Sequence, residues 1–271
     1  MAELEPETAT ASIPRTIHRV WLGSDPLPQD YVRYGESWRA HHPGWTMRLW
    51  TDSDLEELDC EEALARGRGP AERSDLVRYE VLRRYGGVYV DTDFEAFQPI
   101  DPLLEGVDAF TAYLRVDRAK IATGIMGCVP GHPAFEIAAA RAAEWIGTVA
   151  LGETGPWLMF EVVRDFPEVT VFGAELFYPY HWTELHLRDS EFPEAYAAHH
   201  WSLRFLGKLH ERRLEGRERV EELKRELARA EMETNEEKRR RKAAEARVKD
   251  LENRGWRRVA AAARRAAGRR P

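Results

Sequence analysis

Short runs of alternating apolar and polar residues mark strand candidates in the first part of the chain. Thr16–Gly23 (TIHRVWLG) and Trp45–Thr51 (WTMRLWT) alternate in this way, and further candidates are Asp108–Leu114 and Val169–Gly173. Alternation of this kind, bounded by Gly and polar residues, is typical of β-strands. His132–Ile146 has helical spacing instead. Because helices and strands alternate along the chain, the pattern predicts an α/β domain.

A second helical pattern leads directly into another strand. Ser74–Gly87 (SDLVRYEVLRRYGG) places its apolar residues on one helix face, namely Leu76, Val77, Val81, Leu82 and Tyr85. We expect Ser74 to be the N-cap and Gly86 to take the left-handed position after the helix. The run VYV follows at once. Asp91 and Asp93 are therefore predicted at the carboxyl end of a strand, where ligands usually bind in open α/β sheets.

The pattern changes near residue 206. Residues 208–254 contain no Pro and one Gly, and Glu, Arg, Lys and Ala dominate them. Apolar residues recur at 3–4 spacing in two short stretches, but the positions between these stretches are polar: Thr234, Glu237 and Arg241. The pattern predicts a long charged helix over 206–253. It favours neither weak coiled-coil self-association nor a solvated single helix over the other.

Charge divides the chain at the same place. Residues 206–271 carry 22 Lys and Arg against 13 Asp and Glu, whereas residues 1–205 carry 18 against 34, and the whole chain has a net charge of −7. The predicted organisation is a disordered N-terminus (1–12), a globular domain (13–205), the long charged helix (206–253) and a basic tail (254–271). The tail suits either contact with an anionic membrane surface or a frayed end.

Composition argues against a membrane-spanning, secreted or disulfide-rich protein. No stretch approaches the length of apolar sequence that a membrane span needs, and the acidic N-terminus lacks the apolar region of a signal peptide. Cys60 and Cys128 form neither a disulfide framework nor a zinc pattern. We therefore expect a cytoplasmic protein, at most peripheral to the inner face of the cell membrane. The acidic body argues against nucleic acid as a partner.

The Asp-x-Asp pattern is the main chemical candidate. Mg²⁺ and Mn²⁺ prefer oxygen ligands and often bridge carboxylates and a diphosphate. Asp91 and Asp93 can meet one ion only if the strand ends or bends at Thr92, because alternate residues of a strand point to opposite faces. A second copy, Asp52 and Asp54, opens a helical pattern, and we interpret it as a helix start.

Other side chains could take part in such a site. Asp75 and Arg78 lie three positions apart on one helix face, and form either a surface ion pair or a pair that binds a polar ligand. Trp21, at the end of the first strand, is either a core residue or a platform for a nucleobase. His199 or His200, in HHW, could contact a metal or a phosphate, although a lone histidine is more often structural.

Taken together, these segments resemble one family. IPRTIHRVWLG, RSDLVRYEVLRRYGGVYVDTD, GHP, TGP and AHHW occur in this order. They are similar to the Asp-x-Asp glycosyltransferases of the Gly_transf_sug or Och1-like type (glycosyltransferase family 32), and to bacterial members in particular. The resemblance covers residues 13–205. It departs from the family at Thr123 and Gly124, where relatives often have Asn, and at Arg204 and Phe205 after the histidines.

The resemblance implies a GT-A, Rossmann-like domain that binds a nucleotide-sugar (UDP- or GDP-sugar), requires Mn²⁺ or Mg²⁺ and retains the anomeric configuration. It implies that Trp21 stacks on the nucleobase and that Asp75 and Arg78 bind the sugar and ribose hydroxyls of the donor. Asp91 would contact the ribose or the donor sugar, and the metal through water. Asp93 would bind the metal directly, and His199 would complete the metal site. Two glycines, Gly86 and Gly87, would let the backbone approach the donor.

The implied reaction is transfer of a sugar to a glycan, lipid-linked or small-molecule acceptor, as in polysaccharide biosynthesis. No carboxylate stands out as an enzymatic nucleophile, which favours attack by the acceptor from the face that the diphosphate leaves. Two alternatives remain at this point. One is another metal-dependent nucleotide enzyme, a nucleotidyltransferase or hydrolase. The other is a non-catalytic coiled-coil scaffold.

Overall fold

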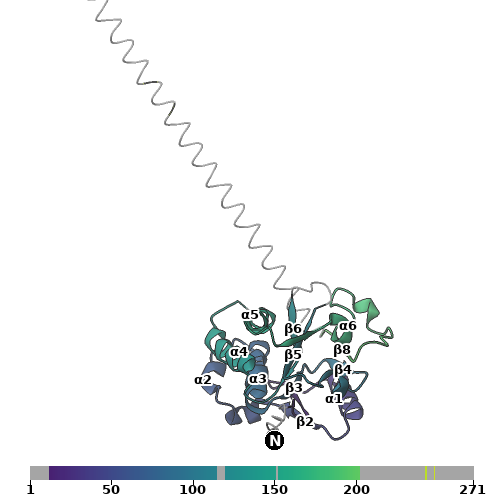
Figure 1. The fold of residues 1–271 in the computed structure, drawn as a ribbon. Coiled ribbons are helices and arrows are strands. Elements are labelled where there is room, and N and C mark those ends of the chain that lie inside the picture. The colour runs from purple at the N-terminus through teal and green to yellow at the C-terminus, as the bar shows by residue number, and fades with distance from the viewer. Residues whose placement is uncertain (1–11, 115–119, 151, 202–241, 243–246, 248–271) are drawn as a thin grey trace, which may run out of the picture. The chain divides into compact units, whose positions relative to one another are not determined.

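The structure is a computed structural model that describes residues 12–114, 120–150 and 152–201, together with Lys242 and Arg247 (Figure 1). The chain divides into two units, 1–203 and 204–271. The predictions for the N-terminus and for the C-terminal helix and tail lie outside the described residues, apart from Lys242 and Arg247, which are helical. Among the described helices, none has the length and apolar character needed to cross a membrane.

A six-stranded mixed sheet forms the centre of the first unit, with strand order β2-β1-β3-β6-β5-β7. All its strands run in the same direction except β6, which is antiparallel to both β3 and β5. A separate two-stranded ribbon pairs β4 with β8. The strands are β1 (Thr16–Val20), β2 (Thr46–Trp50), β3 (Gly87–Val90), β4 (Phe94–Ala96), β5 (Ala109–Tyr113), β6 (Ile121–Cys128), β7 (Thr170–Phe172) and β8 (Ala197–His199).

Helices cover both faces of the sheet, which confirms the predicted α/β class and its Rossmann-like layering. The group α2 to α5 packs on one face, and α1, α6 and the β4–β8 ribbon pack on the other (Figure 1). β3 serves both cores, because Tyr89 belongs to the first, and Val88 and Val90 belong to the second. The α-helices are α1 (Gln29–His41), α2 (Glu61–Leu64), α3 (Pro70–Tyr85), α4 (Pro133–Trp145), α5 (Leu158–Asp165) and α6 (Ala174–Phe177).

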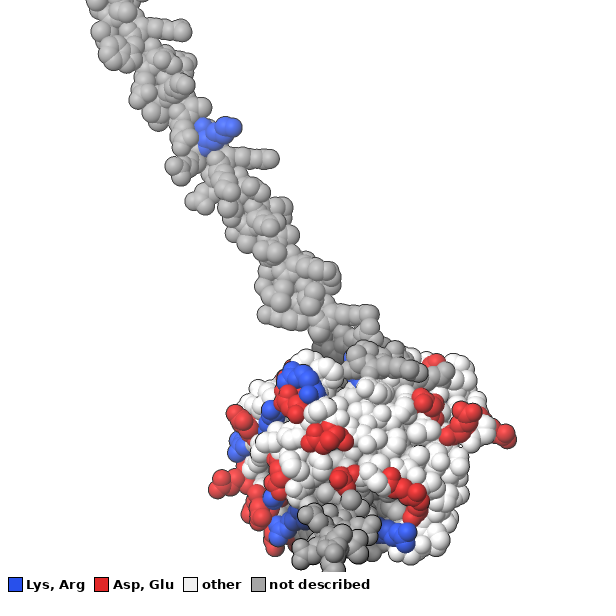
Figure 2. Space-filling view, in the orientation of Figure 1, with Lys and Arg blue, Asp and Glu red and all other residues white. Residues whose placement is uncertain are grey.

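Charged residues of both signs are interspersed on the surface. On the face shown in Figure 2, small groups of acidic and basic side chains alternate around the described part of the globular unit. Several of the basic side chains are paired, for example Arg48 with Glu57 at 2.7 Å and Arg33 with Asp30 at 2.7 Å.

The predicted start of α3 is wrong. Ser74 lies inside the helix, which begins at Pro70 after Gly69. Proline suits the first helical position because its fixed φ matches the helix and its missing N–H would have no partner there. At the other end, Gly86 has the expected positive φ of 63°, but its ψ of −153° is extended rather than helical. Its amide donates to the Leu82 carbonyl at 2.8 Å and closes the last turn.

Gly86 and Gly87 sit at the start of β3, at the opposite end of the strand from Asp91. A Cβ on Gly86 would lie 2.8 Å from the Cys128 carbonyl, and one on Gly87 would lie 2.6 Å from the Thr16 carbonyl. Both glycines therefore allow β3 to start close to the backbones of its neighbouring strands. They lie at the far end of β3 from Asp91, so this position does not support the expected contact with a donor. Tight backbone packing accounts for both residues.

The second Asp-x-Asp begins a helical turn, as predicted, although the helix is broken. Residues Asp52–Glu57 form a 3₁₀ helix (η1), and α2 follows as a separate short helix. Asp54 accepts from the backbone N–H and the hydroxyl of Thr51, both at 2.7 Å, in a capping arrangement. Asp52 accepts from the Gly23 amide at 2.6 Å. Both carboxylates are thus engaged in hydrogen bonds that hold the start of this helical turn.

His18, on β1, should make stability depend on pH. Nδ1 of His18 accepts from the Trp50 indole at 3.0 Å, so Nε2 carries the proton and donates to the Gly86 carbonyl at 3.0 Å. Burial lowers the pKa of His18 to about 4. Because an unfolded histidine titrates near 6.5, its contribution is complete above pH 6.5 and lost as pH falls towards 4. The loss should amount to about 3 kcal/mol.

Urea unfolding at pH 7.5 and pH 4.5 measures this contribution. We expect His18→Gln to be less stable than the wild type at pH 7.5, and to lose less additional stability at pH 4.5. His186→Gln is the matched control, because His186 lies at the surface. Equal pH dependence in the wild type and His18→Gln would contradict the assignment.

Candidate metal and donor site

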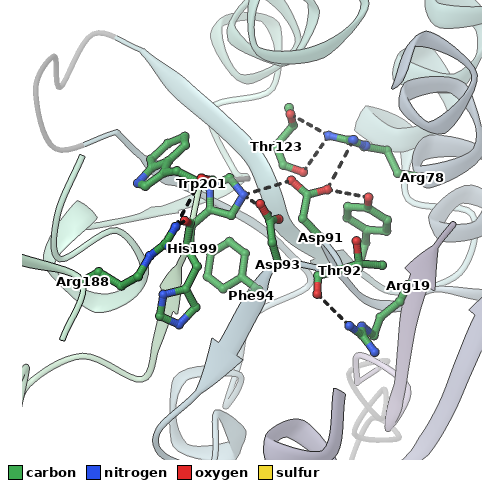
Figure 3. A network of polar contacts seen from close by, with 12 residues as sticks. Arg19, Arg78, Asp91, Thr92, Asp93, Phe94, Thr123, Arg188, His199 and Trp201 are labelled. Atoms are coloured by element: carbon green, nitrogen blue, oxygen red, sulfur yellow. Dashed lines mark hydrogen bonds and ion pairs between the residues drawn. The ribbon is translucent and has the colours of Figure 1, made fainter. Parts of the chain in front are cut away.

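A tight bend brings the two aspartates of the motif to one side of the sheet. β3 ends at Val90 and β4 begins at Phe94. The Asp91 amide donates to the Gly124 carbonyl at 2.8 Å, and the Phe94 amide donates back to the Asp91 carbonyl at 3.1 Å, which closes the turn. The bend expected at Thr92 is therefore confirmed, and both carboxylates point towards His199 (Figure 3).

The buried Arg19 supports this bend from beneath. One of its guanidinium nitrogens donates to the Thr92 carbonyl and to the Tyr31 carbonyl, both at 2.7 Å (Figure 3). Burial lowers the pKa of Arg19 to about 10, so the side chain remains charged at neutral pH. Arg19 thus links β1, the start of α1 and the turn between the two aspartates.

His199 completes an acidic cluster with Asp91 and Asp93. Its Nε2 lies 2.9 Å from Oδ1 of Asp93 and 3.7 Å from Oδ2 of Asp91. One ligand atom from each of the three residues lies within 4.8 Å of the others. β8 pairs with β4 so that His199 is opposite Phe94, and the two rings stack at 5.0 Å. Among the described residues, these three form the cluster with metal-ligand geometry.

His200 belongs to a different network. Its Nε2 lies 2.7 Å from a Glu95 oxygen, and its Nδ1 lies 2.7 Å from the Tyr180 hydroxyl. The ring also stacks on Tyr34 at 4.5 Å. Of the two adjacent histidines, the structure places His199, and not His200, beside the aspartates.

The donor atoms of the cluster suit a divalent cation. Carboxylate oxygens are typical ligands of Mg²⁺ and Mn²⁺, and imidazole is a common ligand of transition metals. Burial opposes a charge on His199, but Asp93 and then Asp91 more than offset it and raise its pKa. The cluster thus favours positive charge between the two carboxylates. A cation bound there would have to replace a proton on His199.

Asp75 and Arg78 of α3 extend the network behind Asp91. The Arg78 guanidinium lies 3.4 Å from Asp91 and donates to the carbonyl and the hydroxyl of Thr123 (Figure 3). It also lies 3.2 Å from Asp75. The Thr154 hydroxyl donates to Asp75 at 2.8 Å. Only 10% of the Arg78 side chain and 14% of the Asp75 side chain are exposed. The alternative of a surface ion pair is therefore wrong.

The charges of this pair depend on each other. Burial raises the pKa of Asp75, and Arg78 counteracts the rise. The pKa of Arg78 is itself raised although burial opposes it, because Tyr89, Asp91 and Asp75 stabilise the cation. Arg78 therefore faces two carboxylates in a poorly hydrated place, and its charge opposes the effect of burial on Asp75.

The two oxygens of Asp91 have different surroundings. Oδ1 accepts from the Tyr89 hydroxyl at 2.6 Å and faces Arg78, whereas Oδ2 faces His199. Oδ1 thus holds the carboxylate in place, and Oδ2 remains available to a ligand. The sequence analysis did not single out Tyr89. Its position two residues before Asp91 on a strand, hence on the same face, was the signal that could have identified it.

Trp21 lies at the carboxyl end of β1, on the same edge of the sheet as Asp91. Its indole donates to the Asp25 carbonyl at 2.7 Å, and its ring meets Tyr31 edge to face at 5.7 Å. The side chain is half-buried. Its neighbour Tyr31 connects this region to the site in two ways: the Tyr31 carbonyl accepts from Arg19, and the Tyr31 ring stacks on Tyr34, which stacks on His200. The role of Trp21 as a nucleobase platform stays a prediction.

Two of the departures from the family pattern, Thr123 and Gly124, lie at this site, whereas Arg204 and Phe205 are outside the described residues. Thr123 binds Arg78 as described above. A Cβ on Gly124 would lie 2.9 Å from Oδ2 of Asp91. Near this place the pairing of β5 with β6 changes register, and such irregularities often occur next to active sites. Any side chain at position 124 would press on Asp91, so the glycine keeps this side of the carboxylate open.

Comparison with known proteins supports the motif. The family described as "Glycosyltransferase sugar-binding region containing DXD motif" matches residues 28–109. The matched segment includes Asp75, Arg78, Asp91 and Asp93, and excludes Trp21 and His199. Because it covers less than half of the chain, it supports the resemblance over α1 to β5 rather than over the whole protein.

The curated relatives are also named as enzymes that transfer sugars. Mannosyl phosphorylinositol ceramide synthase SUR1 of Saccharomyces cerevisiae is 35% identical over 130 residues, 45% of this chain and 33% of that protein. Inositol phosphoceramide mannosyltransferase 3 of Schizosaccharomyces pombe is 33% identical over 131 residues, 46% of this chain and 35% of that protein. The chain thus spans about a third of the length of these relatives. They are yeast proteins, so the expected bacterial origin gains no support.

More distant similarities extend to a human protein and to solved structures. Alpha-1,4-N-acetylglucosaminyltransferase of Homo sapiens is 27% identical over 150 residues, 48% of this chain and 42% of that protein. The PaToxG glycosyltransferase has a TM-score of 0.47 at 14% identity, covering 58% of this chain and 71% of that one. The galactosyltransferase LgtC, solved in complex with donor and acceptor sugar analogues, has a TM-score of 0.43 at 10% identity. The match covers 69% of this chain and 87% of the LgtC chain.

Proposed function

We propose that the chain is a metal-dependent glycosyltransferase with a GT-A arrangement, which moves a sugar from a nucleotide-sugar to an acceptor hydroxyl. The single observation that carries this proposal is the cluster of Asp91, Asp93 and His199 at the carboxyl edge of the sheet, backed by Arg78 and Asp75. Four of these five residues are in the Asp-x-Asp motif or the helix before it. His199 comes from a segment more than 100 residues later in the sequence and converges on the same place, which argues against a chance acidic pair.

Each side chain would have a distinct task. Asp91, Asp93 and His199 would hold a divalent cation, which, when bound, neutralises charge on the leaving diphosphate. Asp75 still has free lone pairs beside Thr154 and Arg78, so it can accept from hydroxyls of the donor. Arg78 stays charged and offsets the repulsion between the carboxylates of Asp75 and Asp91. Trp21, at the same edge of the sheet, would stack on the nucleobase.

The reaction itself would proceed with retention. The bond between the anomeric carbon and the diphosphate oxygen breaks, a bond to the acceptor oxygen forms, and the acceptor proton passes to the leaving diphosphate. Tyr89, Arg78 and His199 already engage the carboxylates of Asp91, Asp75 and Asp93. We therefore favour attack from the face that the diphosphate leaves over a covalent intermediate on one of these aspartates.

The relatives' names guide the choice of substrates. The two yeast proteins are named for mannosyl transfer and inositol phosphoceramide, and the human protein for transfer of N-acetylglucosamine. We accordingly propose a hexose donor and a hydroxyl of a lipid-linked or free polyol or glycan as acceptor. Self-association through 206–253, membrane contact through 254–271 and a cytoplasmic location stay predictions.

A donor panel tests this function. The full chain is incubated with UDP- and GDP-linked glucose, galactose, mannose and N-acetylglucosamine, with Mn²⁺ or with EDTA. We expect one donor to raise the melting temperature and to be hydrolysed slowly, in Mn²⁺ only. The matching nucleoside diphosphate serves as the control ligand.

Two outcomes would favour the rival functions. Turnover of nucleotides that carry no sugar would indicate a nucleotidyltransferase or a hydrolase. Absence of binding by every donor and diphosphate, with the protein folded, would revive the non-catalytic scaffold.

A further inference from the structure

Several buried polar atoms in and around the acidic cluster lack a hydrogen-bond partner, among them the Tyr178 hydroxyl and Nδ1 of His199. Among the described residues, the buried side-chain nitrogen and oxygen atoms without a partner are five guanidinium nitrogens, the hydroxyl of Tyr178 and Nδ1 of His199. The rings of Tyr178 and His199 meet edge to face at 5.8 Å. Buried polar groups are nearly always satisfied, so an exception at a candidate site calls for a functional explanation.

Tyr178 follows α6 and is held firmly by its ring. Only 1% of the residue is exposed. The ring packs against Phe94 at 5.3 Å and Trp201 at 5.9 Å. Burial raises the pKa of Tyr178 well above its usual value and Asp91 raises it further, while the nearby amides of Gly124 and Ile125 act in the opposite direction. The hydroxyl therefore keeps its proton and is able to donate a hydrogen bond.

An acceptor for this proton lies across Gly124. A Cβ on Gly124 would lie 2.9 Å from the Tyr178 hydroxyl and 2.9 Å from Oδ2 of Asp91. The two oxygens thus flank the same point, and the missing side chain leaves them facing each other. Oδ1 of Asp91 already accepts from Tyr89. Because both oxygens lie 2.9 Å from the same point, rotation of the Asp91 carboxylate can change the distance between Oδ2 and the Tyr178 hydroxyl.

We propose that Tyr178 is a positioning residue for Asp91, and that its hydroxyl donates to Oδ2 when Asp91, Asp93 and His199 hold a divalent cation. Tyr89 and Tyr178 then fix the carboxylate from its two sides. Partners that orient metal ligands in this way typically contribute 10–100-fold to metal affinity. This inference rests on the metal-binding part of the proposed function.

Tyr178→Phe isolates the hydroxyl, because it keeps the ring and its packing. Without metal, the hydroxyl has no side-chain hydrogen bond to lose, and only the backbone amides of Gly124 and Ile125 lie near it, so the free energy of unfolding should change little. The dissociation constant for Mn²⁺ alone, measured from the electron paramagnetic resonance signal of free Mn²⁺, should rise about tenfold or more, and tenfold corresponds to about 1.4 kcal/mol.

Tyr180→Phe is the matched control. Tyr180 is also buried, but its hydroxyl is bonded to Nδ1 of His200 at 2.7 Å. Its removal should lower stability and leave Mn²⁺ affinity unchanged. Gly124→Ala supplies a second test, because its Cβ would push Tyr178 and Asp91 apart. This variant should also bind Mn²⁺ more weakly.

The results that would overturn the inference are specific. An unchanged Mn²⁺ dissociation constant in Tyr178→Phe would do so, and so would equal weakening in Tyr178→Phe and Tyr180→Phe, which would indicate a general packing effect. A wild-type chain that binds no Mn²⁺ would overturn it as well. If the wild type binds Mn²⁺ but no nucleotide-sugar, the proposed function fails while this inference stands.

Discussion

Asp93→Asn should reduce sugar transfer, measured as kcat/KM with the donor that the panel identifies, by on the order of a thousandfold. Asp93 contributes the carboxylate nearest to His199, and asparagine keeps its shape while removing the negative charge that a divalent cation requires. Because the reacting diphosphate needs charge compensation at this point, no neighbouring side chain can replace it. Circular dichroism and the melting temperature verify that the variant folds.

The second Asp-x-Asp provides a control in which the same substitution is made outside the candidate metal site. Asp52→Asn makes the same change at a residue that binds the Gly23 amide and Arg73 instead of a metal site. We expect nearly full activity and a small loss of stability. If a folded Asp93→Asn kept near wild-type turnover that still depended on Mn²⁺, the metal assignment would be wrong.

Local patterns were sufficient to predict the frame of the site. The change from helical to alternating spacing near Gly86 predicted α3 followed by β3, and hence two carboxylates at the end of a strand. The bend at Thr92 followed from stereochemistry alone, since alternate side chains on a straight strand cannot meet one ion. Such features depend on neighbours in sequence, which is why they could be predicted.

Contacts between segments that are distant in sequence could not be predicted from local patterns. The sequence offered Ser74 as a helix cap, but the helix begins four residues earlier, at Pro70, with Gly69 in the N-cap position. Thr123 and Thr154 bind Arg78 and Asp75 from β6 and from the bend before α5. Neither contact has a local signature, because only the packing of the whole sheet brings these threonines to α3.

The choice between His199 and His200 illustrates the same limit. Adjacent residues on a strand face opposite sides, so one of the pair had to be turned away from the cluster. Which one depends on the register of β8 against β4, where His199 is paired with Phe94. A shift of that register by one residue would have reversed the roles.

Arg78→Met should lower the free energy of unfolding by about 3–5 kcal/mol, the usual loss when one partner of a buried ion pair is removed. Arg78 is the cation nearest to both Asp75 and Asp91, and Met fills similar volume without charge. Two carboxylates would then remain in a poorly hydrated place without compensation. Urea unfolding at pH 7.5 measures the loss, and Arg84→Met, at the more exposed ion pair with Asp59, should cost under about 1 kcal/mol.

A second substitution distinguishes charge balance from simple packing. Asp75→Asn removes one of the two uncompensated carboxylates, so the double variant Arg78→Met/Asp75→Asn should be more stable than Arg78→Met alone. The coupling should be about 1–3 kcal/mol, as for residues within one charged network. Additive losses would mean that Arg78 stabilises the fold only through its aliphatic contacts. The double variant should still lack donor binding, because restoring neutrality does not restore the groups that contact donor hydroxyls.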